Sequence, residues 1–414
     1  MLKLNSLSNN LFEYNRENDA KVVITNSDGS SNTISRNSVV ASGRLVLTEK
    51  MGRNLSFAGE KYESRLKARG IEYRDAMEAH RNNLLLFCAA RANAEVGKEA
   101  PTTVKEVKEN ALAYSKNDTF IKTLMSITSD VITPLFADTY SDIGARGLVS
   151  FVNVPLGGTF QLDVKSNDTF IFEDSSWGAS RSTSKNYLYG KTLTFNPKPY
   201  SCNATIKFYQ DLVTGDVGDY YASIMRGLWN KVYALAINSF TAGAADPRYI
   251  PSGLIAASYT TENFIRIKEL VAAANGVATA DLIAIGGAVP LSKILPVDGL
   301  GGAITGLQYG LGEKWFEQGY LPMAAEIQLM KIPPVIVAGT QNTTVQTIDL
   351  GDDIYIIARA NNGYAPVVGA MAEGSPITLE RGAESTADFT IDINITLVAD
   401  IKAIFASKVG VIQG

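Results

Sequence analysis

The stretch "DYYASIMRGLWNKVYALAINSFTAG", residues 219–243, and the turn-rich segment that follows it, ending in "PSGLI" at 251–255, decide the fold. In residues 219–243, apolar residues recur at steps of three and four, so one face of a helix formed by this stretch would be apolar. Asp216 or Asp219 can cap its start. The pattern predicts a spine helix of roughly 22 residues, about 33 Å long. The residues of the apolar face are Tyr221, Ile224, Leu228, Val232 and Leu235.

Downstream of this helix the pattern is typical of a separate α/β region. "TENFIRIKELVAAANG" predicts a helix that ends at Asn275-Gly276, "DLIAIGG" a buried strand, and Pro290 the opening of a short helix. Further strand signals are "PPVIVAGT" and "DDIYIIARA". The segment "DFTIDINITLVADIKAIF" alternates apolar and other residues without a break, which predicts a long strand with one buried face before a final "KVGVI".

Residues 159–210 are the most strand-like part of the first half. Two alternating segments flank the polar stretch "EDSSWGASRSTSKN", which predicts two long strands joined by a polar tip. A two-stranded hairpin is marginal alone because it cannot cover its own apolar face. We therefore expect this hairpin to lean on another surface, for which a neighbouring subunit is the natural candidate.

The N-terminal part divides into an arm and a helical segment. The first 55 residues are rich in Asn and Ser and predict an extended arm with little core, carrying one hairpin within "KVVITNSDGSSNTIS" that turns at Asp28-Gly29. Residues 60–95 have helical periodicity, and their apolar stripe includes His80, which predicts a packed or interface histidine. A short helix is expected to end before Pro134. The stripe consists of Tyr73, Met77, His80, Leu84 and Phe87.

Composition excludes several classes of protein. The 414 residues are 46% hydrophobic, enough for two or three domains, and no apolar run approaches the length of a membrane helix. There is no signal-peptide pattern, so we expect a soluble protein made in the cytoplasm. Cys88 and Cys202 are predicted to be buried thiols. With a net charge of −4, no basic run and one histidine, the chain lacks the features of a dedicated nucleic-acid binder and of His-dependent catalysis.

Candidate chemistry is sparse. The glycine cluster "DGLGGAITGLQYGLG", residues 298–312, matches neither a dinucleotide fingerprint nor a phosphate loop and predicts a mobile loop. Asp352 and Asp353 are neighbours on a strand-opening turn and would point apart, and Glu173-Asp174 reads as a solvated pair. We therefore expect no catalytic residue, no cofactor and no metal. The three tryptophans, Trp177, Trp229 and Trp315, are expected to be core or interface anchors.

The order of these pieces resembles the major capsid proteins of tailed bacteriophages, the Hong Kong 97 fold. "SDVITPLFADTYSDIGARGLVSFVNVPLGG" is similar to the link after the family's N-terminal arm, and the "PSGLI" turn to its entry into the axial domain. "ADLIAIGGAVPLSKI" resembles that domain's central strand and helix, and "TIDLGDDIYIIARA" the strand that returns to the peripheral domain. The likeness covers roughly seven tenths of the chain, from about residue 120.

The resemblance implies an α+β, Hong Kong 97-like capsid fold with an N-terminal arm, an extended β-hairpin loop, a long spine helix, a peripheral domain and an axial domain. In some relatives the N-terminal segment is cut away; we expect it to be retained here. The expected divisions are residues 1–115 for the arm and helical segment, 116–158 for the link into the peripheral domain, 159–204 for the extended loop, 205–250 for the spine helix, 251–345 for the axial domain and 346–414 for the return strands.

The function implied is that of a major capsid protein that assembles through pentamers and hexamers into an icosahedral shell around double-stranded DNA. Expected contact residues at the loop tip are Trp177, Arg181 and Tyr187. The resemblance also implies a virion location after assembly in the host cytoplasm, portal and scaffolding or cement proteins as partners, only non-specific proximity to DNA, and no membrane. We predict no covalent cross-link between subunits.

Two alternatives stay open at this point. An encapsulin-like compartment shell would have the same fold and enclose a protein cargo. A metal-dependent hydrolase using Asp352 or Asp353 would belong to another class, and the single histidine argues against it.

Overall fold

The computed structural model describes most of the chain and divides it into two compact units. Unit 1 comprises Met1–Thr139, Pro199–Leu228 and Gly374–Val398, and unit 2 comprises Tyr140–Lys198, Trp229–Glu373 and Ala399–Gly414. The described residues are 21–25, 31–51, 56–57, 60–145, 148–165, 189–207, 217–245, 250–294, 319–337, 339–340, 343–358, 365–373, 377–385, 390–404 and 408–414.

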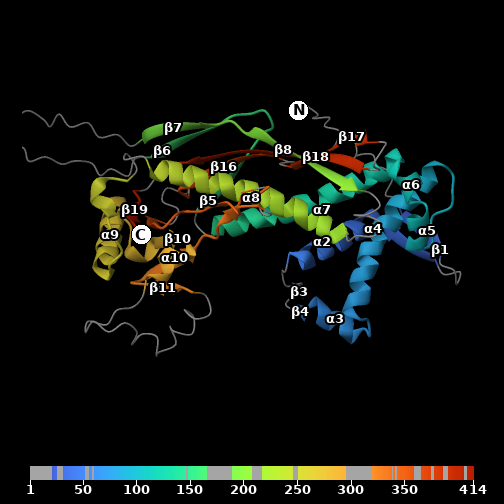
Figure 1. The fold of residues 1–414 in the computed structure, drawn as a ribbon, viewed down its shortest axis with the longest axis horizontal. Helices are drawn as coiled ribbons and strands as arrows, with labels where there is room; N and C mark the ends of the chain where they lie inside the picture. The colour runs from blue at the N-terminus through green and yellow to red at the C-terminus, as the bar shows by residue number, and fades with distance from the viewer. Residues whose placement is uncertain are drawn as a thin grey trace, which may run out of the picture. The chain divides into compact units, whose positions relative to one another are not determined.

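Four elements contribute residues to both units: helix α7 (Asp118–Ala145), strand β8 (Lys198–Lys207), helix α8 (Val217–Ala244) and strand β18 (Thr390–Ala403). Figure 1 labels the elements along the chain. The elements wholly of unit 1 are β1 (Lys21–Thr25), β2 (Ser31–Ser35), α2 (Arg36–Lys50), β3 (Ser56–Phe57), β4 (Glu60–Lys61), α3 (Tyr62–Ala68), α4 (Tyr73–Glu95), α5 (Val104–Glu109), α6 (Ala111–Ser115) and β17 (Ile377–Ser385).

The N-terminal arm contains a helix that the sequence analysis did not predict. β1 and β2 pair antiparallel, which confirms the expected hairpin, but the chain then turns directly into α2. Ser35 caps this helix, because its hydroxyl accepts a hydrogen bond from the Ser38 backbone N–H at 3.3 Å. The expectation of a core-poor arm is wrong for this stretch. Four side chains of α2 are almost fully buried: Val39, Val40, Val46 and Leu47.

Gly43 explains how closely α2 can pack. A Cβ added at this residue would lie 2.7 Å from Cγ2 of Val131 on α7 and 3.7 Å from Cε2 of Tyr221 on α8. Real Cβ atoms do not approach other carbon atoms as closely as the first distance, so the absence of a side chain permits the contact. The Asn- and Ser-rich composition around α2 had hidden this packing pattern.

Helix α7 continues through Pro134, and the expected end before that residue is wrong. Proline cannot donate to the carbonyl four residues earlier, which belongs to Asp130. Nη2 of Arg44, on α2, donates a hydrogen bond to that carbonyl at 3.0 Å. The helix can therefore run on because a side chain from another element satisfies the carbonyl group.

Helix α8 is longer than predicted, with 28 residues, or about 42 Å at the usual rise. The predicted apolar face is confirmed: its first four residues are buried, and Leu235 is half-buried. Asp219 lies in the first turn and forms an ion pair with Lys50 of α2, with a distance of 2.9 Å between Nζ and Oδ1.

The elements wholly of unit 2 include a six-stranded sheet in the order β11-β12-β10-β15-β19-β9. These elements are β5 (Val149–Val154), β6 (Phe160–Lys165), β7 (Tyr189–Phe195), η2 (Ser252–Leu254), β9 (Ile255–Ala256), α9 (Thr261–Asn275), η3 (Thr279–Asp281), β10 (Leu282–Gly286), α10 (Ala288–Ser292), β11 (Met323–Ala324), β12 (Ile327–Lys331), β13 (Val335–Ile336), β14 (Thr347–Ile348), β15 (Ile354–Ala358), β16 (Val367–Ala372) and β19 (Gly410–Ile412).

The core of unit 2 confirms most of the α/β prediction. β10 is buried along its whole length, and α9 packs against β15 and β19 (Figure 1). Thr260 caps α9, whose end is set by Gly276 at a φ of 62°, a left-handed conformation suited to glycine. β15 and β19 hydrogen-bond within the sheet of β10, so the expected boundary at residue 346 separates strands that pair with one another.

Strand β18 is the predicted long alternating strand, and its pairing changes along its length. Its N-terminal part pairs antiparallel with β17, and its C-terminal part pairs antiparallel with β16, which pairs parallel with β5. β8 also pairs with β18. Cys202 on β8 is exposed whereas Cys88 on α4 is buried, so the prediction of a buried thiol is correct for Cys88 and wrong for Cys202.

Candidate subunit-contact site

The predicted contact residues Trp177, Arg181 and Tyr187 lie outside the described residues, and so do Glu173-Asp174 and Trp315. What the structure describes is the root of the hairpin that carries the first three. β6 and β7 pair antiparallel from Phe160 opposite Phe195 to Lys165 opposite Tyr189, which confirms the predicted pair of strands (Figure 1). Residues 166–188 connect them.

The apolar face of the root is covered by the chain's own sheet. Leu162, Val164 and Phe195 are buried and form one cluster with Val368 and Ala370 of β16. Phe195 is fully buried, and its ring centroid lies 5.9 Å from that of Phe160. The expectation that this hairpin leans on another surface is therefore confirmed for the described root, but that surface belongs to unit 2 of the same chain rather than to the neighbouring subunit that we expected.

Two charged residues of β18 hold the root by hydrogen bonds. Nζ of Lys402 donates to the backbone carbonyl of Thr194 at 2.7 Å, and the backbone N–H of Asn196 donates to Oδ2 of Asp400 at 2.8 Å. Lys402 and Asp400 also form an ion pair at 3.0 Å. Lys402 Nζ lies 5.5 Å from the Phe195 ring centroid, within the range of a cation–π contact. We call these residues, Asp400 and Lys402, the root clamp.

The opposite face of the root is polar and exposed. Gln161, Asp163, Thr192 and Thr194 alternate with the buried positions and are all exposed. Thr192 donates from Oγ1 to Oδ1 of Asp163 across the strands at 2.6 Å. One face of the hairpin root is thus fixed to unit 2, and the other presents hydrogen-bonding groups to its surroundings.

The alternative carboxylate pair, Asp352 and Asp353, lies where the chain enters β15. Asp352 is exposed in the turn before β15, as predicted, and Asp353 accepts a hydrogen bond from the Gly414 backbone N–H at 3.4 Å. The pKa of Tyr355 is raised to about 12, mainly because the phenol is buried and secondly because Asp353 lies beside it. Within the described residues there is no group of three or more His, Cys, Asp or Glu side chains able to hold a metal ion. The glycine cluster at 298–312 lies outside these residues.

His80 packs at the junction of three helices, as its position on the apolar stripe predicted. Its Nδ1 lies 2.9 Å from Oγ of Ser42 on α2, and its Nε2 lies 2.8 Å from the hydroxyl oxygen of Tyr62 on α3. Ser42 is 5% exposed and His80 is half-buried. Burial lowers the pKa of His80. No local sequence pattern signals these two partners, because they come from separate segments.

Trp229 is a partly buried anchor of α8, consistent with the prediction. Its ring centroid lies 5.8 Å from that of Tyr233, one helical turn later. Among the described helices, none has both the length and the apolar character that crossing a membrane requires.

Comparisons with known proteins find partial similarity to solved structures only. The sequence matches no protein-family model, and no curated protein matches it. The mature capsid of bacteriophage PhiM1 is similar over 65% of this chain and 86% of its own, with 13% identity and a TM-score of 0.40. The holo-SrpI encapsulin complex from Synechococcus elongatus PCC 7942 is similar over 68% of this chain and 88% of its own, with 10% identity and a TM-score of 0.37.

A virus-like particle from Pyrococcus furiosus is similar over 68% of this chain and 98% of its own, with 12% identity and a TM-score of 0.39. A bacteriophage capsid, the kind of assembly that the sequence resembles, is among these structures. The scores describe a partial likeness of fold.

Proposed function

We propose that this chain is a major capsid protein, a structural subunit without catalytic activity. In this proposal it assembles through pentamers and hexamers into an icosahedral shell that encloses the double-stranded DNA genome of a tailed bacteriophage. Portal and scaffolding or cement proteins would be further partners. The protein would be assembled in the host cytoplasm and reside in the virion.

The observation that carries the proposal is the anchored root of a long hairpin. β6 and β7 are separated by residues 166–188, far more than the two to five residues usual between hairpin strands. Long connections in compact proteins usually have a function. The root clamp and the buried Phe195 fix the base of the two strands to unit 2, at the end away from this connection, and an anchored base is what a contact arm requires.

The contact residues of the proposal are Trp177, Arg181 and Tyr187. All three lie in the connection between the two strands. Aromatic residues and arginine are enriched at the energetically dominant positions of protein interfaces. A division into an arm, an extended loop, a spine helix, a peripheral domain and an axial domain is part of the same proposal.

The first test is the size of the purified full-length protein by light scattering, with negative-stain microscopy of any large species. Closed shells, or free pentamers and hexamers, are expected. A species that stays a compact monomer at every concentration contradicts the proposal. Extraction of the contents of shells purified from infected cells then separates a DNA-filled capsid from an encapsulin-like compartment, in which a protein cargo would be found.

A variant pair tests the contact arm itself. Trp177→Ala with Arg181→Ala is expected to leave the subunit folded but to prevent shell closure, because the contact would lose its anchors. Lys105→Ala is the control, since it removes an exposed charge on α5, whose side chain is 85% exposed. If the double variant and the control assemble equally well, these residues are not the contact.

A further inference from the structure

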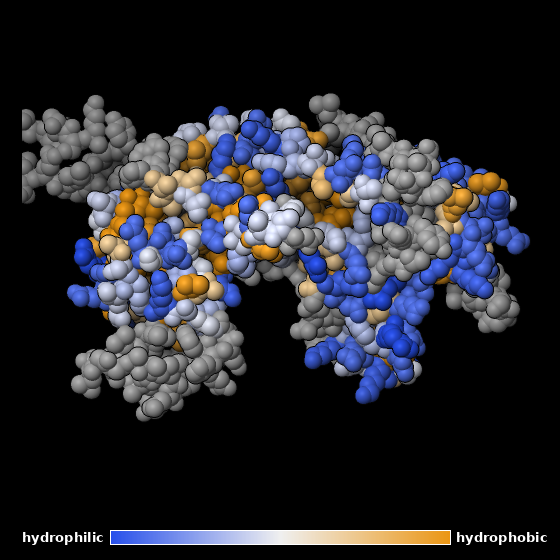
Figure 2. Space-filling view, in the orientation of Figure 1, coloured by the Kyte–Doolittle hydropathy of each residue, from blue (hydrophilic) through white to orange (hydrophobic). Residues whose placement is uncertain are grey.

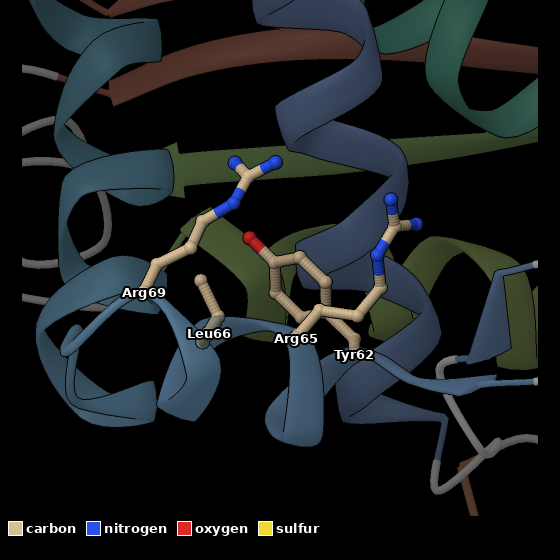
Figure 3. Close-up of a pocket in the computed structure, with 4 residues that line it drawn as sticks. All are labelled: Tyr62, Arg65, Leu66 and Arg69. Atoms are coloured by element: carbon tan, nitrogen blue, oxygen red, sulfur yellow. The ribbon is translucent and has the colours of Figure 1, made fainter.

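A cavity of about 250 Å³ opens beside helix α3 in unit 1. Its walls are formed by Tyr62, Arg65, Leu66 and Arg69. Figure 3 shows the two guanidinium groups on the two sides of the Tyr62 ring, with that of Arg69 toward the phenolic oxygen. Pockets for drug-sized ligands are about 300–1,000 Å³, so this cavity suits one small chemical group.

The charge of the walls selects the kind of group. Two of the four lining side chains are arginines and none is a carboxylate. Arg69 forms no ion pair within the part of the chain that the structure describes. The surrounding surface of α3 is hydrophilic on the face shown in Figure 2. A guanidinium group offers a planar fork of N–H donors, which matches the oxygen atoms of an oxyanion.

Behind the cavity, Tyr62 is connected to the only histidine of the chain. The Tyr62 hydroxyl lies 2.8 Å from Nε2 of His80, and Ser42 lies 2.9 Å from Nδ1. A neutral imidazole has one donor and one acceptor nitrogen, whereas an imidazolium has two donors. When His80 is protonated, Tyr62 and Ser42 must both accept from the ring. The Tyr62 hydroxyl hydrogen then points away from His80, where an anion in the cavity can accept it.

Among the groups around His80, we expect only His80 itself to change its protonation state near neutral pH. On α2, Glu49 accepts a hydrogen bond from Arg81 of α4 at 3.0 Å. Burial, with Glu49 as the next cause and Glu63 of α3 contributing, raises the pKa of Tyr73 to about 12. Burial also raises the pKa of Tyr62, and Arg69 opposes this. Both phenols thus stay protonated, and histidine is the side chain that ordinarily titrates between pH 5 and 8.

We propose that this cavity binds a small oxyanion of the sulfate or phosphate type, held by Arg65, Arg69 and the Tyr62 hydroxyl, and that anion binding and protonation of His80 reinforce each other. The reciprocity follows from linkage: an anion that favours the charged ring must bind more tightly to it. The site does not depend on the shell function. The phosphate could be a free ion or a phosphodiester, since both present the same oxygen atoms.

The single histidine makes the test direct. Full-length protein labelled with ¹³C in histidine gives one ring to follow by NMR as the pH is changed, with and without sulfate. Sulfate remains a dianion over this pH range, so a change in the titration reports the protein. Sodium chloride at equal ionic strength is the reference, because salt screens exposed charges. We expect sulfate to raise the pKa of His80 by about half a unit or more. Superimposable titration curves would overturn the proposal.

Three variants locate the effect. Arg69→Ala is expected to weaken sulfate binding about tenfold or more, since it removes a charged hydrogen-bond donor. Arg74→Ala is the matched control: this arginine is 84% exposed and pairs with Asp75 outside the cavity. Tyr62→Phe is expected to keep part of the affinity but to lose the dependence on His80 protonation. Circular dichroism confirms that each variant is folded. Equal losses in Arg69→Ala and Arg74→Ala would show general surface charge and refute the site.

The source of the phosphate is decided by two probes, inorganic phosphate and a short single-stranded oligodeoxynucleotide. A shift of the His80 titration by phosphate alone assigns the site to the free ion. A shift by the oligonucleotide that is lost in Arg69→Ala assigns it to a phosphodiester. Absence of both shifts contradicts the proposal.

Discussion

Nη2 of Arg44 donates a hydrogen bond to the backbone carbonyl of Asp130 at 3.0 Å, four residues before Pro134. In a regular helix the N–H of residue 134 would donate a hydrogen bond to this carbonyl, but proline has no N–H. Arg36 adds a second contact from the same helix, since it forms an ion pair with the carboxylate of Asp130. Two arginines of α2 thus bind both the side chain and the backbone of one residue of α7.

The Arg44 hydrogen bond is expected to matter only while Pro134 is present. Arg44→Ala should lower the free energy of unfolding by about 0.5–1.5 kcal/mol, the usual net value of a hydrogen bond. In a Pro134→Ala background the restored N–H at residue 134 can bond to Asp130, so the cost of Arg44→Ala should shrink. Urea denaturation of the four proteins of this double-mutant cycle gives the coupling. Equal costs in both backgrounds would show that the two groups are independent.

Stability should fall with acidification because of His80. Burial lowers its pKa in the folded protein below the ordinary value of about 6.5, so the unfolded chain binds the proton more readily. The free energy of unfolding should therefore decrease as the pH falls below about 6.5, by at most about 1.4 kcal/mol per pH unit, and level off below the folded-state pKa. Thermal unfolding across this range measures it. In His80→Gln this decrease should be absent, since the chain has no other histidine.

Two glycine-to-alanine variants should change stability in opposite directions. At Gly43 the new Cβ would lie 2.7 Å from Val131 Cγ2, so Gly43→Ala should destabilise the protein by about 1–3 kcal/mol. Gly227 lies in the interior of α8, and apart from its chain neighbours and the nearby backbone of the helix itself no atom lies within 4 Å of the position that a Cβ would take. Gly227→Ala should therefore stabilise the protein by up to about 1 kcal/mol. Denaturant midpoints measure both. If Val131→Ala fails to relieve the Gly43→Ala defect, the overpacking explanation is wrong.

Phe195 should be the most sensitive residue of the hairpin root. It is fully buried against β16, so Phe195→Ala should lower the free energy of unfolding by about 3–5 kcal/mol. Thr192, an exposed residue of the same strand, offers a control whose change to alanine should cost well under 1 kcal/mol. Hydrogen exchange at the amides of β6 and β7 localises the effect. Unchanged exchange in Phe195→Ala would mean that the strands do not depend on this contact.

The sequence predicted those elements whose signal is local. The spine helix, the α9 helix with its Gly276 end, the buried strand β10, the long strand β18 and the pairing of β6 with β7 each repeat a short pattern that one segment contains in full. Periodicity is sufficient for such elements, although it underestimated the length of α8.

The features that were missed depend on contacts between distant segments. A proline usually ends a helix, and α7 continues past Pro134 because Arg44 of α2 donates a hydrogen bond to the carbonyl of Asp130. The support of the hairpin by β16 and the two partners of His80 also join residues far apart in the chain. The contact residues Trp177, Arg181 and Tyr187 stay a prediction, which the assembly experiment tests.

The packing of Gly43 also sets the order of events during synthesis. Its partner Tyr221 is made about 180 residues later, roughly 10–35 s at ribosomal speeds of about 5–20 residues per second. α4 emerges much sooner and packs against α2, so one side of this helix can be covered early. The side that faces Val131 and Tyr221 cannot be covered until those residues have been synthesised. A nascent chain of intermediate length therefore exposes apolar surface, which a chaperone would be well placed to shield.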